Sequence, residues 1–162
     1  MCGIAGFLNL GNNHQKTEKE KYEILRKMNE AQRHRGPDDE GAFLENGCGL
    51  GHVRLSIIDL YRGHQPMCKK REGNTYAIIL NGEIYNMKPL KEQLIKEGEV
   101  FSTTSDTEVV LTGYIRHGIS YMEQLNGIFA IALWDGKRKK LYLIRDRVGV
   151  KPLFYTKQGD TL

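Results

Sequence analysis

The sequence predicts an α+β domain in which helices cover layered sheets. Strand-like segments gather toward the two ends of the chain, and segments with helical periodicity lie between them. The length of 162 residues suits one domain with a core of its own. Because we find no internal repeat, low-complexity segment or linker, we expect a single domain.

In the first part of the chain, apolar residues recur at spacings of three through a stretch rich in Lys and Glu, which predicts a helix. Gly36 can end this helix, and Pro37 cannot continue it. Asn46-Gly47 is a strong hairpin signal between two strands. The expected helix spans residues 17–32, and the expected strands span residues 2–9, 41–45 and 49–58.

In the second part, residues 76–80 are nearly all apolar and predict a buried strand, which we expect Asn81-Gly82 to break. Asn86 is the expected N-cap of one helix, and Ser105–Glu108 fit a capping box at the start of another. The turn at Asp135-Gly136 predicts a hairpin. The helices are expected over residues 86–98 and 105–118, and the strands over residues 128–134, 141–145 and 151–155.

The composition argues against several classes of protein. The net charge of +4 comes from Lys and Arg scattered among acids, and the cluster at residues 137–140 is typical of a solvated turn, so we expect no nucleic-acid partner. No secretory signal precedes Cys2, and the longest apolar run, residues 128–134, is too short to span a membrane. We therefore expect a cytoplasmic protein with no membrane contact.

Cysteine and histidine spacing gives no sign of a metal site or a disulfide framework. The three cysteines, at positions 2, 48 and 68, have neither even-count pairing nor C-x-x-C spacing. The five histidines also lack the spacing of metal ligands. We expect reduced thiols and no structural metal.

Cys2 is the strongest candidate for a catalytic residue. Removal of Met1 would leave a cysteine that carries a thiol and a free α-amine. A thiol needs a proton acceptor to attack at neutral pH, and an α-amine with a pKa of about 7.7 to 8 can serve as that base. N-terminal nucleophile enzymes use this pairing. The alternative is a cysteine that only packs in the first strand.

Six short blocks of residues stand out along the chain. Their order is the order seen in glutamine-hydrolysing asparagine synthetases, so the chain resembles the glutaminase domain of that family, a class II amidotransferase domain, from Cys2 to about Tyr155. The blocks are Met1–Gly6, His34–Asp38, Arg54–Asp59, Asn81–Asn86, Ser105–Glu108 and Arg145–Pro152.

The resemblance implies an N-terminal nucleophile hydrolase fold, a four-layer αββα sandwich of two antiparallel sheets. It implies a glutaminase domain over residues 2–162, with the final strands missing and no ATP-binding synthetase domain. L-Glutamine would be the substrate, and this domain would need no cofactor. ATP and magnesium would belong to a C-terminal synthetase domain, the partner expected in the full protein, and a homodimer is left open.

The resemblance also assigns roles in catalysis. Cys2 would attack the side-chain carboxamide of glutamine and form a γ-glutamyl thioester, releasing ammonia. The side-chain amide of Asn81 and the backbone N–H of Gly82 would stabilise the oxyanion, a role in which one lost donor typically reduces the rate by about 10² to 10³. The simpler alternative for Asn81-Gly82 is a turn after a strand.

Substrate binding is assigned in the same way. Arg54 would grip the α-carboxylate through two parallel hydrogen bonds, and Asp106 and Glu83 would face the α-ammonium. Without the family match, Arg54 is typical of a surface ion pair and Asp106 of a first helical turn. Further substrate contacts are expected from Leu55, Ser56, Ile57 and Ile58.

Two other functions stay open. One is a cysteine hydrolase that uses Cys2 or Cys48 with a histidine such as His34 or His52. The other is a non-catalytic or regulatory module that keeps the amidotransferase fold. The blocks at residues 34–38 and 145–152 could shape the pocket rim, meet a second domain or be purely structural.

Overall fold

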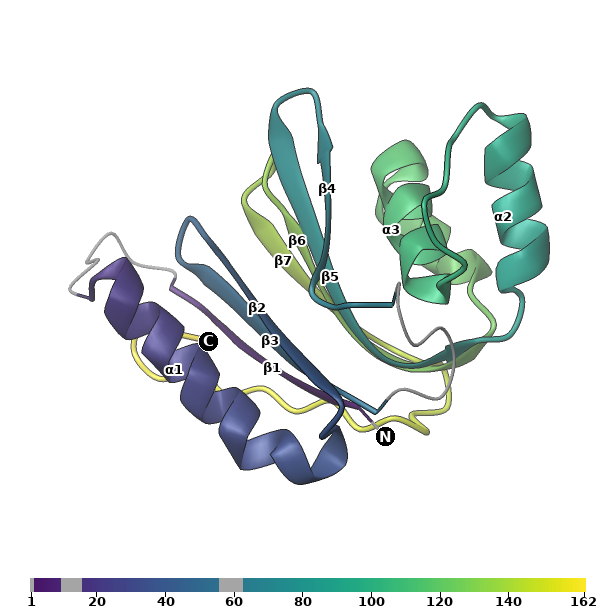
Figure 1. Cartoon of the computed structure of the whole chain (residues 1–162). Coiled ribbons are helices and arrows are strands. Elements are labelled where there is room, and N and C mark those ends of the chain that lie inside the picture. The colour runs from purple at the N-terminus through teal and green to yellow at the C-terminus, as the bar shows by residue number, and fades with distance from the viewer. Residues whose placement is uncertain (1, 10–15, 56–62) are drawn as a thin grey trace.

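The chain forms four stacked layers, as Figure 1 shows. The structure is a computed structural model that describes residues 2–9, 16–55 and 63–162. Helix α1 (Glu18–Gln32) covers one side of a three-stranded sheet, and α2 (Met87–Lys96) and α3 (Asp106–His117) cover the far side of a four-stranded sheet. The αββα arrangement predicted above is confirmed. Short 3-10 helices follow α1 and α3 at Arg33–Arg35 and Ile119–Gln124.

The first sheet has the strand order β1-β3-β2, with all neighbours antiparallel. The predicted hairpin between β2 and β3 is confirmed, because Asn46 and Gly47 both adopt positive φ values of 49° and 79°. The strands of this sheet are β1 (Gly3–Leu8), β2 (Asp39–Glu45) and β3 (Cys48–Arg54).

The second sheet has the order β4-β5-β6-β7 and is also antiparallel. The sequence did not predict β4, an edge strand with three consecutive basic residues. Edge strands tolerate such charges because they protect the edge from pairing with another chain. The strands are β4 (Met67–Arg71), β5 (Asn74–Ile84), β6 (Gly127–Asp135) and β7 (Lys140–Arg145).

The prediction that Asn81-Gly82 breaks the strand is wrong. Strand β5 continues to Ile84 because β6 pairs with it along the whole length, including Gly82 opposite Phe129. Gly82 has a φ of 152°, and a Cβ atom there would collide with the carbonyl oxygen of Ile128. Glycine is needed here for close approach of two backbones inside the sheet.

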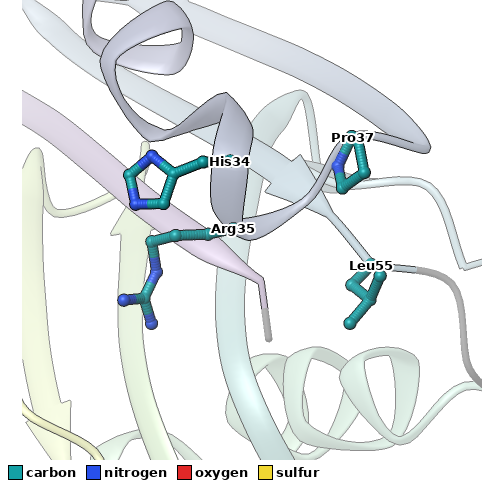
Figure 2. Close-up of a pocket in the computed structure, with 4 residues that line it drawn as sticks. All are labelled: His34, Arg35, Pro37 and Leu55. Atoms are coloured by element: carbon teal, nitrogen blue, oxygen red, sulfur yellow. The ribbon is translucent and has the colours of Figure 1, made fainter.

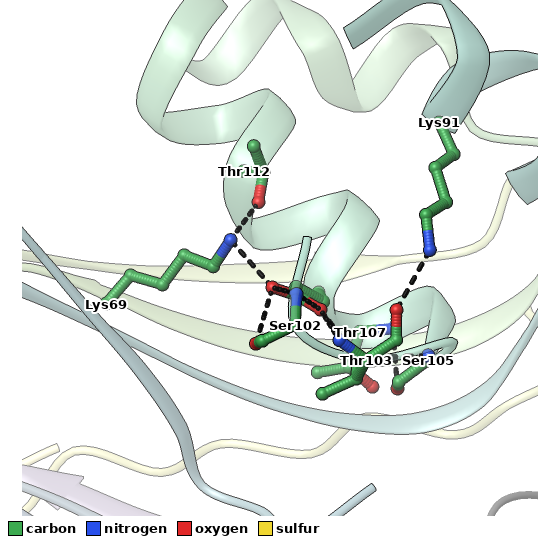
Figure 3. Close-up of polar contacts among 8 residues, drawn as sticks. Lys69, Lys91, Ser102, Thr103, Ser105, Thr107 and Thr112 are labelled. Carbon is green, nitrogen blue, oxygen red and sulfur yellow. Dashed lines mark hydrogen bonds and ion pairs between the residues drawn. The ribbon is translucent and has the colours of Figure 1, made fainter. Parts of the chain in front are cut away.

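Two of the three helix starts differ from the simplest expectation. Thr17 and Glu20 form a complete capping box for α1. At α2, Asn86 is the N-cap residue, as predicted, but its side chain makes no capping hydrogen bond, because it bonds instead to the backbone of Gln124 and Asn126. Ser105 caps α3 through the N–H of Thr107 (Figure 3). Glu108 accepts hydrogen bonds from the preceding loop instead, so the predicted capping box is not closed.

The strand expected at residues 151–155 is absent, and this segment is irregular. Phe154 and Tyr155 are largely exposed there, at 89% and 76%. The chain then turns at residues 158–161 and pairs with the outer edge of β1. Leu8 and Leu162 exchange two backbone hydrogen bonds of 3.0 and 2.9 Å.

Two apolar clusters stabilise the layers. One lies between the sheets and contains Leu50, Ile79 and Trp134, and the other lies between the second sheet and α2 and α3. Trp134 also donates a 2.8 Å hydrogen bond from its indole N–H to Glu45, which ties the two sheets together. Burial of each large apolar side chain contributes about 1.5–3 kcal/mol. No helix in the described ranges is both long and apolar enough to cross a membrane.

Candidate active site

The layer between the sheets changes from apolar to polar along β3. Side chains of a strand alternate between its two faces. Gly49 and Gly51 lie under α1, where Cβ atoms would collide with Phe7 and Asn29. The other face points toward the second sheet and carries, in order, Cys48, Leu50, His52 and Arg54. The polar end of this layer is therefore the end at which β3 finishes.

Cys2 lies at that same polar end. Because Gly3 pairs with Val53, Cys2 enters β1 beside Arg54. The thiol is half-buried, and its sulfur lies 3.9 Å from the carbonyl oxygen of Leu55. Arg35 donates from Nε to the carbonyl oxygen of Cys2 at 3.3 Å, which fixes the backbone of the proposed nucleophile.

Asn81 reaches the polar end from the second sheet. It follows Ala77 and Ile79 on the face of β5 that packs in the inter-sheet cluster. Its side chain is 6% exposed, and its amide makes no hydrogen bond to any part of the chain that the structure describes. The amide still reaches solvent, so it is available to donate a hydrogen bond to a ligand.

Asp106 and Glu83 form a pair of acids close to this end, called here the paired carboxylates. Asp106 accepts hydrogen bonds from the N–H groups of Ile84 and Thr107 at 3.0 and 2.8 Å. Burial raises the pKa of Asp106, these hydrogen bonds oppose the shift, and the charge of Glu83 adds to it. Among the described residues neither carboxylate has a salt-bridge partner, so the pair suits a cationic group of a ligand.

The block at residues 34–38 forms a wall of the site. His34, Arg35 and Pro37 line a pocket of about 350 Å³ together with Leu55, as Figure 2 shows. Gly36 packs directly on β3, and a Cβ atom there would lie 2.6 Å from backbone atoms of Arg54. Asp38 donates its N–H to the carbonyl oxygen of Arg54 at 3.1 Å. The motif therefore contacts the backbone of the residue predicted to bind the carboxylate of glutamine.

The block at residues 145–152 is a loop built around a buried carboxylate. Asp146 accepts from the N–H groups of Lys151, Val150 and Phe129, and these bonds lower its pKa. Arg145 binds the carbonyl oxygens of Gly149 and Lys151 in the same loop. These contacts lie within the loop or join it to β6, which supports a structural role for this motif.

The histidine chemistry of a cysteine–histidine hydrolase finds little support. Burial lowers the pKa of His52 to about 4, with partial compensation from the nearby Leu80 backbone, although neither ring nitrogen forms a hydrogen bond within the described residues. Burial raises the pKa of the Cys48 thiol to about 12. Both groups are therefore neutral at physiological pH. The Cys2 sulfur bonds to a carbonyl, and no described histidine bonds to it.

Seven of the ten predicted site residues can be placed. Cys2, Arg54, Leu55 and Asn81 lie at the polar end of the layer, where Gly82, Glu83 and Asp106 also belong by their position on β5 and α3. Ser56, Ile57 and Ile58 lie outside the described residues. Sequence reasoning missed Arg35 as a support for Cys2, although it lies inside a motif. Within the described ranges, no cluster of three potential metal ligands occurs.

The fold and the family match together define the class of protein, a glutamine amidotransferase domain. Residues 1–162 match the family model of the glutamine amidotransferase domain, and the chain belongs to this family. At 22% identity, the glutamine phosphoribosylpyrophosphate amidotransferase of Bacillus subtilis superimposes with a TM-score of 0.75 over 98% of this chain and 40% of that chain. The shared architecture is the N-terminal nucleophile hydrolase fold.

More particularly, the chain corresponds to the N-terminal domain of glutamine-hydrolysing asparagine synthetases. It is 43% identical over 161 residues to asparagine synthetase [glutamine-hydrolyzing] 3 of Bacillus subtilis (strain 168), covering 99% of this chain and 26% of that protein. It is 40% identical over 177 residues to putative asparagine synthetase [glutamine-hydrolyzing] 2 of Methanocaldococcus jannaschii, covering 99% and 33%. The chain thus spans about a quarter to a third of the length of these relatives.

Proposed function

We propose that this chain performs the glutaminase half-reaction of an asparagine synthetase, in which L-glutamine is hydrolysed to L-glutamate and ammonia. The observation that carries the proposal is the convergence of Cys2, Arg54 and Asn81 at one end of the inter-sheet layer. Cys2 directly precedes β1, whereas Arg54 and Asn81 lie on β3 and β5. No requirement of core packing brings a thiol, a guanidinium and a carboxamide together there.

Substrate binding follows from the charges around that end. The α-carboxylate of glutamine would pair with the guanidinium of Arg54, whose planar fork matches a carboxylate. The α-ammonium would lie against the paired carboxylates Glu83 and Asp106 and offset the repulsion between them. Held at both charged groups, glutamine would present its side-chain carboxamide to Cys2.

The first half of the reaction would form the thioester. The α-amine of Cys2 takes the thiol proton, and the sulfur forms a bond to the carboxamide carbon while the carbonyl electron pair moves to oxygen. The Asn81 side-chain amide and the Gly82 N–H donate hydrogen bonds to that oxyanion. As the oxyanion collapses, the C–N bond breaks, and the leaving nitrogen takes the proton from the Cys2 ammonium and departs as ammonia.

In the second half, water would be the nucleophile that hydrolyses the thioester. The α-amine of Cys2 takes a proton from water, and the hydroxyl oxygen adds to the thioester carbon. The same two donors hold the second oxyanion. When the C–S bond breaks, the sulfur recovers its proton and L-glutamate is released. Both halves of the reaction need only glutamine, water and groups of this domain.

We further infer that the ammonia serves a synthetase domain in a longer protein. The support is the length of the relatives, of which this chain matches about a quarter to a third. That domain would use ATP and magnesium to activate aspartate. We also propose that the protein is cytoplasmic and that glutamine is its substrate. A homodimer is left open.

The experiment that tests the function uses the processing of Met1. While Met1 remains, the nitrogen of Cys2 is an amide and cannot act as a base, so retained protein should be nearly inactive. Protein shown by intact mass to lack Met1 should release glutamate from glutamine, and Cys2→Ala should abolish release. Cys2 should also react with a glutamine-mimicking diazo-ketone. Failure of processed protein both to react and to release glutamate would support a non-catalytic module instead.

A further inference from the structure

Gln65 belongs to none of the recognised motifs, yet it lies buried between the two halves of the proposed site. Its side chain is 7% exposed. Its Oε1 accepts from the N–H of Leu80 at 2.6 Å, and its Nε2 donates to the Thr107 hydroxyl at 3.2 Å. Leu80 directly precedes Asn81, and Thr107 directly follows Asp106. One side-chain amide therefore links the strand of the oxyanion donors to the helix of the ammonium site.

The edge of β5 explains why a side chain is found at this point. Strand β4 pairs with β5 only as far as Met67 opposite Ile78, so the later N–H groups on that edge need other partners. Leu80 obtains Gln65, and the Ile84 N–H donates to Asp106 at 3.0 Å. The edge is thus closed by side chains on both sides of Gly82.

The N–H of Gly82 points toward the same edge. Opposite Gly82 on β6, Phe129 uses its N–H and its carbonyl oxygen for Asp146, at 3.2 and 2.9 Å, and so faces away from β5. Alternation in an antiparallel strand then directs the Gly82 N–H to the side of Leu80 and Ile84. A neighbouring strand would pair with all three N–H groups. Gln65 and Asp106 satisfy two of them, and no acceptor for the Gly82 N–H occurs in the part of the chain that the structure describes, so it is available to a ligand.

We propose that Gln65 is a positioning residue for the glutaminase reaction. It takes the place of a strand partner at Leu80, which holds the following Asn81 and Gly82 in the geometry of an oxyanion site. Its bond to Thr107 sets the position of that site relative to Asp106, and hence to the α-ammonium of the substrate. The inference rests on the proposed function, because the oxyanion and ammonium roles are those of glutamine hydrolysis.

The kinetic test compares three variants of the processed protein. Gln65→Met keeps the size of the side chain and removes both hydrogen bonds, and kcat should fall between about 10- and 100-fold, since a small misplacement of oxyanion donors has effects of that order. Gln65→Glu keeps an acceptor for Leu80, and the Thr107 hydroxyl can turn to donate to it, so this variant should recover most of kcat. Tyr114→Phe is the matched control, because it removes a buried 2.6 Å hydrogen bond to Asp135 elsewhere on α3.

A second readout does not need activity. Hydrogen exchange followed by mass spectrometry should show faster exchange in Gln65→Met at two separate segments, residues 80–84 and residues 103–108, while Tyr114→Phe leaves both unchanged. Faster exchange at both segments in a protein that hydrolyses no glutamine would retain the link and refute the proposed function. Unchanged exchange at residues 103–108, or a Gln65→Met enzyme with the kcat of Tyr114→Phe, would overturn the positioning role.

Discussion

Arg54 and Asn81 contact different parts of the proposed substrate, and their substitution should therefore affect different kinetic constants. Arg54→Lys loses the second parallel hydrogen bond to the α-carboxylate, a contact held equally in ground and transition states, so KM should rise about 10-fold or more. Asn81→Ala removes an oxyanion donor and should lower kcat by about 10² to 10³ with little change in KM. Steady-state glutamate release measures both, and the reverse assignment would mean that the two roles are exchanged.

Gly36 makes a second prediction at this scale, since its importance comes from contact rather than from turn geometry. Gly36→Ala places a methyl group 2.6 Å from the backbone of Arg54, so residues 34–38 must move off β3. We expect a KM for glutamine raised several-fold, with lower thermal stability. Gly73→Ala is the control, because nothing lies within 4 Å of it and its φ of 76° adds a strain of about 1 kcal/mol far from the site. Equal KM values in both variants would contradict the contact.

Individual site residues were predictable only where a motif carried them. Cys2 could be reasoned from its chemistry, while Arg54, Asn81 and Asp106 needed the family match, because each has an ordinary structural role in isolation. Gln65 could not be found, since its importance depends on where β4 stops pairing with β5. Strand pairing between residues far apart in sequence leaves no local signal.

At the scale of elements, the start of α3 depends on a buried acid that caps a loop. Glu108 is 1% exposed and accepts hydrogen bonds from the backbone and hydroxyls of Ser102 and Thr103, with Lys69 at 2.9 Å. Figure 3 shows these partners and the bond from Lys69 to Thr112. Burial alone would raise the pKa of Glu108, but the bonds from Thr103, Ser102 and Lys69 outweigh it and lower the pKa to about 2.

This shift predicts acid-sensitive stability. A carboxyl with a folded-state pKa below its unfolded value contributes stability above the unfolded pKa, and that stability is lost as pH falls through the folded pKa. The contribution of Glu108 should therefore be complete above about pH 5 and disappear toward pH 2, with a size on the order of 3 kcal/mol.

Denaturant unfolding at several pH values measures the effect. Glu108→Gln should lower the free energy of unfolding at pH 7 and flatten its decline between pH 5 and about 2. Glu23→Gln is the control, because the pair of Glu23 with Arg26 on α1 is half-exposed and should contribute little. A Glu108→Gln protein that keeps the pH dependence of the unchanged chain would contradict the assignment.

Most elements were predictable because their patterns are local. The helix over residues 17–32 and the hairpins at Asn46-Gly47 and Asp135-Gly136 have their own periodicity and turn signals. The strand ends were not, because pairing with β6 overrides the turn preference of Asn81-Gly82. Residues 151–155 have a strand-like composition, but the carboxylate of Asp146 bonds to the N–H groups of Val150 and Lys151 and directs the backbone into a loop.

For the whole molecule, the layered fold was predictable in class, and its four layers came from the family resemblance. The order β1-β3-β2 and the meeting of the two sheets at a polar end are long-range features that composition cannot fix. The site lies at the end of the apolar cluster between the two sheets. The packing of that cluster therefore holds the strands that carry the site residues. The chain that carries this site matches only part of the length of its relatives.

The chain alone should hydrolyse glutamine without making asparagine. The sequence contains no Gly-rich phosphate-loop motif, and the prediction rests on that pattern. Processed protein incubated with glutamine, aspartate, magnesium and ATP should yield glutamate and ammonia at a rate independent of ATP and aspartate. Chromatographic separation of the amino acids is the measurement. Asparagine formed in an ATP-dependent manner by the pure chain would refute the assignment of synthesis to another domain.

The pairing of β1 also bears on when Met1 can be removed during protein synthesis. Strand β1 has no partner until residues 48–54 are made, and among the described residues Leu162 pairs with its outer edge. At translation rates of about 5–20 residues per second, β3 follows β1 by roughly 2 to 10 seconds. During that interval the residues of β1 have no sheet partner. Removal of Met1 can therefore be completed before the nucleophile is built into the sheet, and slower folding would widen that interval without altering the finished site.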